Sequence, residues 1–301
     1  MKLNTWARQW LRRTWPGRPG RAPQDRRAAI IIVNFNTGEL LSHLLFSIFR
    51  VLDRRQLARV VVVDNASTDL SRPLLEALRA AGLVEVLFNA TQRYHGPALN
   101  QAMDHLATEP DVDYVWVLDS DTVVLRADAL HDAVAFLAAH QASLVGQLHA
   151  HKAIPEGYAH VSSLLLDPVK VWRRGLAPFE EAGTPAKALQ ISLRRRGLVV
   201  RDFPFRSHNY ILHLGRGTLA QIKEAQNQDN RYFKWASEHS QPHYHGNAEG
   251  ARIHEEFLDV FRAEVPQLSP AALVAACQRR GAVQLNLPPP AEHPTTENLN
   301  A

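Results

Sequence analysis

Two carboxylates stand two residues apart, directly after an apolar run. Val115 to Leu118 has the character of a buried strand, and it leads into Asp119, Ser120 and Asp121. Aspartates at positions i and i+2 after a strand bring hard oxygen ligands close together. Mg²⁺ and Mn²⁺ prefer such ligands and complete their coordination shell with water and diphosphate oxygens. The spacing therefore predicts a divalent-metal site that neutralises charge on a diphosphate leaving group.

Polar residues also follow two other apolar runs. The first run of the chain leads into Asn34 and Asn36, and the second into Asp64 and Asn65. Asn and Asp are common turn and cap residues, and any one of them alone has about even odds of being only a cap. Ligands of open parallel sheets bind beyond the carboxyl ends of the strands. Three polar groups at that edge therefore favour a binding site.

The elements that position these residues alternate along the first half of the chain. Apolar, β-branched runs predict strands at 28–35, 60–63, 83–88 and 114–118, and helical spacing predicts helices at 38–52, 71–81, 97–106 and 128–140. Strands that are apolar throughout, separated by helices, are typical of a parallel sheet covered on both faces. The predicted fold class is α/β, a mainly parallel sheet flanked by helices.

The second half of the chain is less regular. It predicts strands at 161–166, 198–203 and 210–214, one helix at 186–196, and two helices between 252 and 276. This mixed α+β region is expected to extend the sheet and to supply the acceptor side of a site.

Length and composition narrow the class of protein. The 301 residues, 46% hydrophobic and 21% charged, are typical of one large globular domain. No window approaches 18 consecutive apolar residues, and no apolar core follows the basic N-terminus, so neither a transmembrane helix nor a secretory signal is expected. The single cysteine, Cys277, excludes an intramolecular disulfide and a cysteine-based zinc cage, and it favours the reducing cytoplasm.

The two ends of the chain differ from its middle. Residues 1–27 carry eight lysines and arginines against one acid, with Trp6, Trp10 and Trp15 among them. This segment is expected to be flexible or to lie on an anionic membrane surface, where tryptophan is favoured. Nucleic acid is not expected as a partner, because the basic stretch is short and the rest of the chain lacks a reading motif. The proline-rich tail, 285–301, is predicted to be disordered.

Four motifs occur in a familiar order: IIIVNFNTGELL, VVVVDNASTD, GPALNQAM and VWVLDSD, spread over about 30–124. They resemble those of GT-A-fold glycosyltransferases, in particular glycosyltransferase family 2 and its rhamnosyltransferase-like members. The resemblance implies a Rossmann-like GT-A domain at 28–284. Its nucleotide-sugar half would be 28–150 and its acceptor half 151–284.

The resemblance also implies roles for individual residues. Asn36 and Asp64 would hold the nucleobase and ribose, since an ionised carboxylate accepts hydrogen bonds from hydroxyl and imide groups. The full set placed at the nucleotide sugar is Asn34, Asn36, Asp64, Asn65, Arg93, Gly96, Asn100, Asp119, Ser120 and Arg216. Asp119, Asp121 and His213 would ligate the metal, and Asp121 and His213 would also assist catalysis. Without the resemblance, the preferred interpretation of His213 is a core histidine at a strand end.

One departure from the family pattern concerns the catalytic base. Inverting relatives carry a Glu-Asp pair before the helix at 186–196, and Pro185-Ala186 stands there instead. Glu180 or Glu181 would serve as the base if the loop shifts. Otherwise the base lies elsewhere, or the activity is altered.

The predicted function is the transfer of a hexose or deoxyhexose from a UDP-, dTDP- or GDP-linked donor to a hydroxyl of a glycan or lipid-linked glycan. Mg²⁺ or Mn²⁺ would assist this transfer, which would invert the configuration of the sugar. The enzyme would act in cell-surface polysaccharide synthesis, in the cytoplasm or at the inner face of the membrane. Two alternatives stay open. A nucleotidyltransferase that makes nucleotide sugars would favour a glycine-rich, basic loop after the first strand, and the residues from Asn34 to Gly38 do not form one. A non-catalytic nucleotide-sugar-binding protein would account for the missing Glu-Asp pair.

Overall fold

A seven-stranded sheet forms the centre of the computed structural model, which describes residues 14–15, 26–109, 111–151, 154–181, 184–215 and 248–287. The strand order is β3-β2-β1-β4-β7-β6-β8. The strands are β1 (Ala28–Asn34), β2 (Leu57–Asp64), β3 (Glu85–Phe88), β4 (Tyr114–Asp119), β6 (Leu144–His151), β7 (Ile154–Leu166) and β8 (Val200–Asp202). β1 to β4 are parallel to one another, as their uniformly apolar sequences predict.

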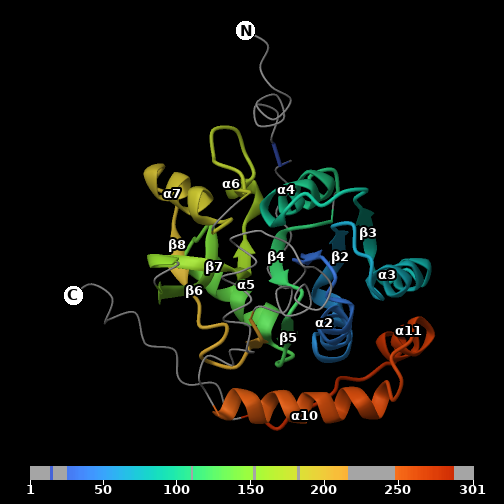
Figure 1. The fold of residues 1–301 in the computed structure, drawn as a ribbon. Coiled ribbons are helices and arrows are strands. Elements are labelled where there is room, and N and C mark those ends of the chain that lie inside the picture. Colours follow the sequence, from blue (N-terminus) through green and yellow to red (C-terminus); the bar gives the residue numbers. More distant parts are fainter. Residues whose placement is uncertain are drawn as a thin grey trace.

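Helices cover both faces of the sheet, and Figure 1 shows α4, α6 and α7 on one face and α2, α5 and α10 on the other. The helices are α2 (Gly38–Val51), α3 (Ser71–Ala80), α4 (His95–Leu106), α5 (Ala129–Ala139), α6 (Pro168–Val171), α7 (Lys187–Arg195), α10 (Ala248–Glu264) and α11 (Pro270–Gln278), with a short 3₁₀ turn at Arg54–Gln56. The two faces carry separate apolar clusters because alternate residues of each strand point to opposite sides. The predicted α/β fold class is confirmed.

The second half of the chain extends the sheet through antiparallel strands. β7 pairs antiparallel with β4 and with β6, and β8 pairs parallel with β6. The sequence did not predict β6, whose later residues Gln147 and His149 break the apolar run. The expected division at residue 150 falls inside this strand, so the two halves share one sheet. The division into donor and acceptor halves stays a prediction.

A second, two-stranded sheet lies after β4. β5 (Thr122–Val124) pairs antiparallel with β9 (Ile211–His213). β9 corresponds to the predicted strand at 210–214, but it belongs to this small sheet and does not extend the main one. This pairing brings a late segment of the chain back to the end of β4. The predicted late strand therefore serves to place His213.

The C-terminal helices close the face that carries α2. Phe257 and Phe261 of α10 pack edge-on against Phe46. The buried Arg50 donates to Glu264 at 2.7 Å and to the carbonyl groups that follow α11. Among the helices of the described ranges, none has both the length and the apolar character needed to span a bilayer.

Candidate active site

Three parallel strands end at the same edge of the sheet, and each ends in a polar residue. Asn34 is the register partner of Asp64, and Val33 is the partner of Asp119. The register therefore brings the three polar segments together, as their positions after the strands predict.

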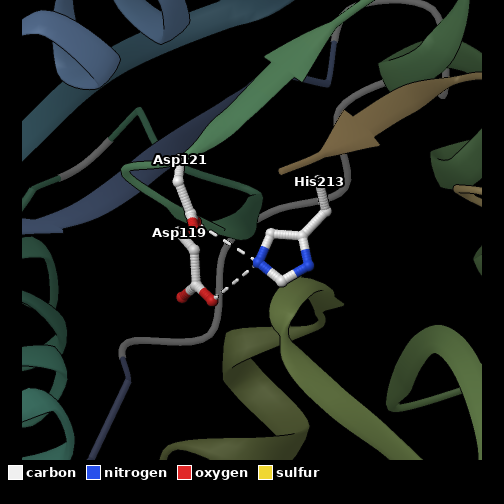
Figure 2. Close-up of side chains that lie close together, drawn as sticks. All are labelled: Asp119, Asp121 and His213. Atoms are coloured by element: carbon white, nitrogen blue, oxygen red, sulfur yellow. Dashed lines mark ion pairs between the residues drawn. The ribbon is translucent and has the colours of Figure 1, made fainter. Parts of the chain in front are cut away.

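Asp119, Asp121 and His213 converge at this edge (Figure 2). Asp119 ends β4, Asp121 follows the turn at Ser120, and Thr122 of β5 lies opposite His213 of β9. His213 Nε2 lies 3.3 Å from Asp121 Oδ1 and 3.5 Å from Asp119 Oδ2. One ligand atom from each side chain lies within 4.8 Å of the other two. Two carboxylates and an imidazole are ligands that Mn²⁺ accepts, and Mg²⁺ accepts the carboxylates.

The charges of these side chains are coupled. Burial by itself would lower the pKa of His213, but Asp121 and Asp119 raise it to about 9. Burial would likewise raise the pKa of Asp119, but the hydrogen bond from His213 and the nearby His95 hold it below its ordinary value. A positive charge is thus held between two carboxylates. The same carboxylates would hold a divalent cation, and His213 would then be a neutral nitrogen ligand.

Two buried atoms at the cluster are suited to a ligand. Asp119 Oδ1 and His95 Nε2 face each other at 3.5 Å, and both lack a hydrogen bond to any described residue. Buried polar atoms in folded proteins almost always have a partner. A metal ion with its water or phosphate oxygens would supply partners to both atoms, so the residues present fit the predicted group.

A hydrogen-bonded network supports the neighbouring strand ends. Asn34 Nδ2 donates to Asp64 Oδ1 at 2.9 Å, and Ser67 N donates to Asp64 Oδ2 at 3.2 Å. Thr37 Oγ1 bonds to Asn34 Oδ1 at 2.6 Å and to Ser120 Oγ at 2.9 Å. Asp64 is 1% exposed. The observed contacts of Asn34, Asp64 and Ser120 therefore fasten the loops of β1, β2 and β4 to one another.

Asn36 is placed closer to the surface of this edge. It adopts a positive φ of 52°, which asparagine tolerates, and its Oδ1 accepts from Thr68 N at 2.7 Å. Its predicted contact with the nucleobase stays a prediction.

Comparison with models of known protein families identifies the family of this chain. The model of glycosyl transferase family 2 matches residues 29–199, more than half of the chain, including Asp119 and Asp121. The chain belongs to glycosyl transferase family 2. His213 lies beyond the matched residues and reaches the site through the β5–β9 pair.

Solved structures show distant likeness to this family 2 glycosyltransferase, and no curated protein matches its sequence. S. aureus TarS 1–349 in complex with UDP-GlcNAc is 18% identical, with a TM-score of 0.39 over 48% of this chain and 46% of that chain, so the alignment spans about half of the solved TarS chain. The mannosyltransferase PcManGT from Pyrobaculum calidifontis, in complex with GDP-Man and Mn²⁺, is 20% identical, with a TM-score of 0.48 over 90% and 84%. Glucosyl-3-phosphoglycerate synthase from Mycobacterium tuberculosis, with Mn²⁺ and UDP, is 16% identical, with a TM-score of 0.45 over 63% and 76%.

In this glycosyltransferase, Asn65 holds the loop that leads into α4. Its Oδ1 accepts from Arg93 N at 3.0 Å and from Asn89 Nδ2 at 3.1 Å, and its Nδ2 donates to the Tyr94 carbonyl at 3.2 Å. Tyr94 has φ 59° and ψ 172°, a backbone region populated almost only by glycine. The strained turn directs the imidazole of His95 toward Asp119, while the side chain of Arg93 is exposed.

Asn100 and Gly96 hold the segment that carries the two candidate bases. Asn100 Nδ2 donates to the Phe179 carbonyl at 2.9 Å, and its Oδ1 accepts from Phe179 N at 3.0 Å. A side chain at Gly96 would collide with the main chain of Glu180. These contacts bring the main chain of Glu180 against Gly96, the residue that follows His95 at the start of α4, and the side chains of Glu180 and Glu181 are exposed. Both polar atoms of the Asn100 side-chain amide thus bond to the protein, and its predicted contact with the donor stays a prediction.

Two residues near the cluster were not singled out from the sequence. The ring of His160 on β7 lies 5.8 Å from that of His213, and burial lowers its pKa to about 4. Arg206 is close enough to lower the pKa of His160 further, and burial reduces its own pKa to about 10. The predicted strand began at residue 161, directly after His160, whereas β7 begins at Ile154 and therefore includes His160. The predicted diphosphate contact Arg216 lies outside the described residues.

Proposed function

We propose that this glycosyltransferase moves a hexose or deoxyhexose from a nucleoside-diphosphate donor to a hydroxyl of a glycan or lipid-linked glycan, with inversion. The observation that carries the proposal is the convergence of Asp119, Asp121 and His213 at the carboxyl edge of the parallel strands. The donor base would be uracil, thymine or guanine. The acceptor would belong to a cell-surface polysaccharide reached from the cytoplasm or from the inner face of a membrane.

The three side chains would hold Mn²⁺ or Mg²⁺, which when bound would neutralise charge on the leaving diphosphate. The chain's own contribution is a set of preorganised groups. Asp119 and Asp121 are fixed by β4 and β5, and His95 is aimed at the same point by the strained turn. Groups that are already oriented need no rearrangement when charge develops in the transition state.

Proton transfer from the acceptor requires a base, for which Glu180 and Glu181 are the proposed groups. Their segment is tied to α4 through Asn100 and Gly96, close to the proposed diphosphate site. Their exposure suits contact with an acceptor that arrives from solvent. A carboxylate on this side would deprotonate the hydroxyl as it attacks, and it would do so from the acceptor face of the donor sugar.

The first experiment measures donor binding by calorimetry. UDP, GDP and dTDP are titrated with and without Mn²⁺ into the wild type, Asp121→Asn and the matched control Asp259→Asn, whose carboxylate is exposed on α10. We expect one nucleotide to bind in a Mn²⁺-dependent manner, with at least about tenfold loss in Asp121→Asn and none in the control.

Absence of Mn²⁺-dependent binding for all three nucleotides would contradict the proposal. If the donor binds but no sugar is transferred to any acceptor of a broad panel, the chain would instead be a non-catalytic nucleotide-sugar-binding protein. The Pro185-Ala186 pair, which replaces the Glu-Asp pair of inverting relatives, motivates this alternative. Formation of a nucleotide sugar from a sugar phosphate and a nucleoside triphosphate, with release of pyrophosphate, would instead establish a nucleotidyltransferase.

A further inference from the structure

Basic residues are concentrated in the segment that forms α6 and α7. Residues 170–201 hold eight lysines and arginines against two acids, Glu180 and Glu181, while the whole chain holds 34 against 30. Outside this segment and the basic N-terminal 27 residues, acids therefore outnumber lysines and arginines. The charge of the molecule is unevenly distributed.

Four exposed arginines flank the contact between the turn after α6 and the end of α7, and they define the α6–α7 basic face: Arg173, Arg174, Arg195 and Arg196. The guanidinium of Arg196, at the end of α7, lies directly over Gly175 in the turn after α6. Ala177 N donates to Ser192 Oγ at 3.0 Å and fastens the same turn to α7. The arginine pair before Gly175 therefore lies beside the pair at the end of α7.

These arginines lack the partners that other arginines of the molecule have. Arg59 is paired with Glu85, Glu109 and Asp111. All four arginines of the α6–α7 basic face are exposed, and within the described ranges none lies within 4.0 Å of a carboxylate. The dipole of α7 favours Arg195 and Arg196 at its C-terminus, but it does not account for the neighbouring Arg173 and Arg174. Like charges gathered at one place repel one another, so the arrangement suits an anionic partner.

Two apolar residues belong to the same side of the molecule. Val169 of α6 is 44% exposed beside these charges. Trp15 is 6% exposed and joins the apolar cluster that includes Val171 and Trp172. Trp15 therefore belongs to the layer of α4, α6 and α7, on the face of the sheet opposite to α10.

We propose that the α6–α7 basic face binds the surface of an anionic lipid membrane. Arginines around an exposed apolar side chain are typical of interfacial contact, in which the cations meet headgroups and the apolar group enters the boundary. A nucleic acid would require exposed aromatic rings or a reading element among the arginines, and the α6–α7 basic face holds neither. The proposal does not depend on sugar transfer.

The test is co-sedimentation of the full chain with vesicles of phosphatidylcholine alone or with about one third phosphatidylglycerol. We expect binding to the mixed vesicles alone, and its loss at high salt. Arg173→Glu/Arg174→Glu should weaken the partition coefficient at least about 30-fold, since the loss of each cation near an anionic surface costs about fivefold and each new carboxylate is repelled in addition. The matched control Arg252→Glu/Arg262→Glu makes the same charge change on the exposed surface of α10, on the opposite face, and should bind like the wild type.

A second variant separates the two basic regions. Replacement of Arg8, Arg12 and Arg13 by glutamine removes charge from the N-terminal segment alone. If this variant lost vesicle binding while Arg173→Glu/Arg174→Glu kept it, the membrane contact would belong to the N-terminus and the proposal would be wrong. Equal losses in the α10 control, or equal binding to both kinds of vesicle, would also overturn it. Calorimetry with nucleotides shows independently whether the donor site remains intact.

Discussion

Side chains at the candidate site divide into those with buried polar atoms that a ligand could bond and those that hold the protein's own backbone. Asp119 Oδ1 and His95 Nε2 belong to the first kind, because both are buried and lack hydrogen bonds among the described residues. Asn65 and Asn100 belong to the second, because each pairs its amide with main-chain groups of another loop. An asparagine can do this because it offers a donor and an acceptor side by side, as the backbone does.

The role of Asn100 can be tested directly. In Asn100→Ala the Phe179 amide and carbonyl lose their partners, which should destabilise the fold by about 2 kcal/mol and loosen the segment of Glu180. We expect turnover to fall at least about tenfold, because the base loses its position, while the affinity for the nucleotide stays within about twofold.

A matched control separates position from stability. Gln190 pairs its buried amide with the Ala159 backbone at 2.9 Å in both directions, and among the described residues it has no hydrogen bond to Phe179 or Glu180. Gln190→Ala should cost similar stability but little turnover. A large loss of nucleotide affinity in Asn100→Ala would instead support the donor contact that the family resemblance implies for it.

At the scale of elements, the position of α10 depends on a buried histidine. The ring of His43 on α2 lies 4.5 Å from that of Phe261 and 5.9 Å from that of Phe257. Burial, with His254 and Arg262 nearby, lowers its pKa to about 4 from the ordinary 6.5. Protonation of His43 therefore disfavours the packed state of α10.

The resulting pH dependence has a definite sign. Below pH 6.5 the unfolded chain takes up a proton on His43 that the folded chain refuses until about pH 4. The free energy of unfolding should fall through this window by up to about 1.4 kcal/mol per pH unit from this group. Urea unfolding of wild type and His43→Phe at several pH values measures the difference, which should diminish in the variant. His131→Phe, changed at an exposed histidine, is the control and should keep the wild-type slope; a variant slope equal to that of the wild type would contradict the interpretation.

At the scale of the whole molecule, the candidate metal site joins two distant parts of the chain. Asp119 and Asp121 follow β4, whereas His213 comes from β9, beyond the residues matched by the family model. A ligand that binds all three side chains stabilises the state in which β9 is paired with β5, because binding to the folded state alone raises its stability.

Mn²⁺ should therefore raise the midpoint of thermal unfolding of the wild type. At about 100 times the dissociation constant the stabilisation is about 2.7 kcal/mol, a rise of roughly 4–6 °C for a chain of this size. The rise should shrink to near zero in His213→Ala and persist in His131→Ala, measured by calorimetry with and without Mn²⁺. An equal rise in both variants would show that the metal binds elsewhere.

The parallel core and the polar edge were predictable from the sequence because both depend on local pattern. An unbroken apolar strand such as β1 or β4 is favoured only where both faces are buried, and the residues that follow such strands must share one edge. For the same reason Asp119 and Asp121, two residues apart, could be predicted to lie together. β6 was missed because its polar residues break that local pattern.

The partners of these residues were decided by contacts between segments far apart in the chain. His213 meets Asp121 because β9 pairs with β5, and His160 joins them because β7 lies antiparallel beside β4. The bonds of Asn100 to the Phe179 backbone likewise depend on the approach of a distant segment, which the sequence does not show. The arginines of the α6–α7 basic face are two separate pairs in the sequence and become neighbours because Arg196, at the end of α7, lies over Gly175. Sequence spacing reports neighbours within one element, whereas tertiary packing alone determines which elements meet.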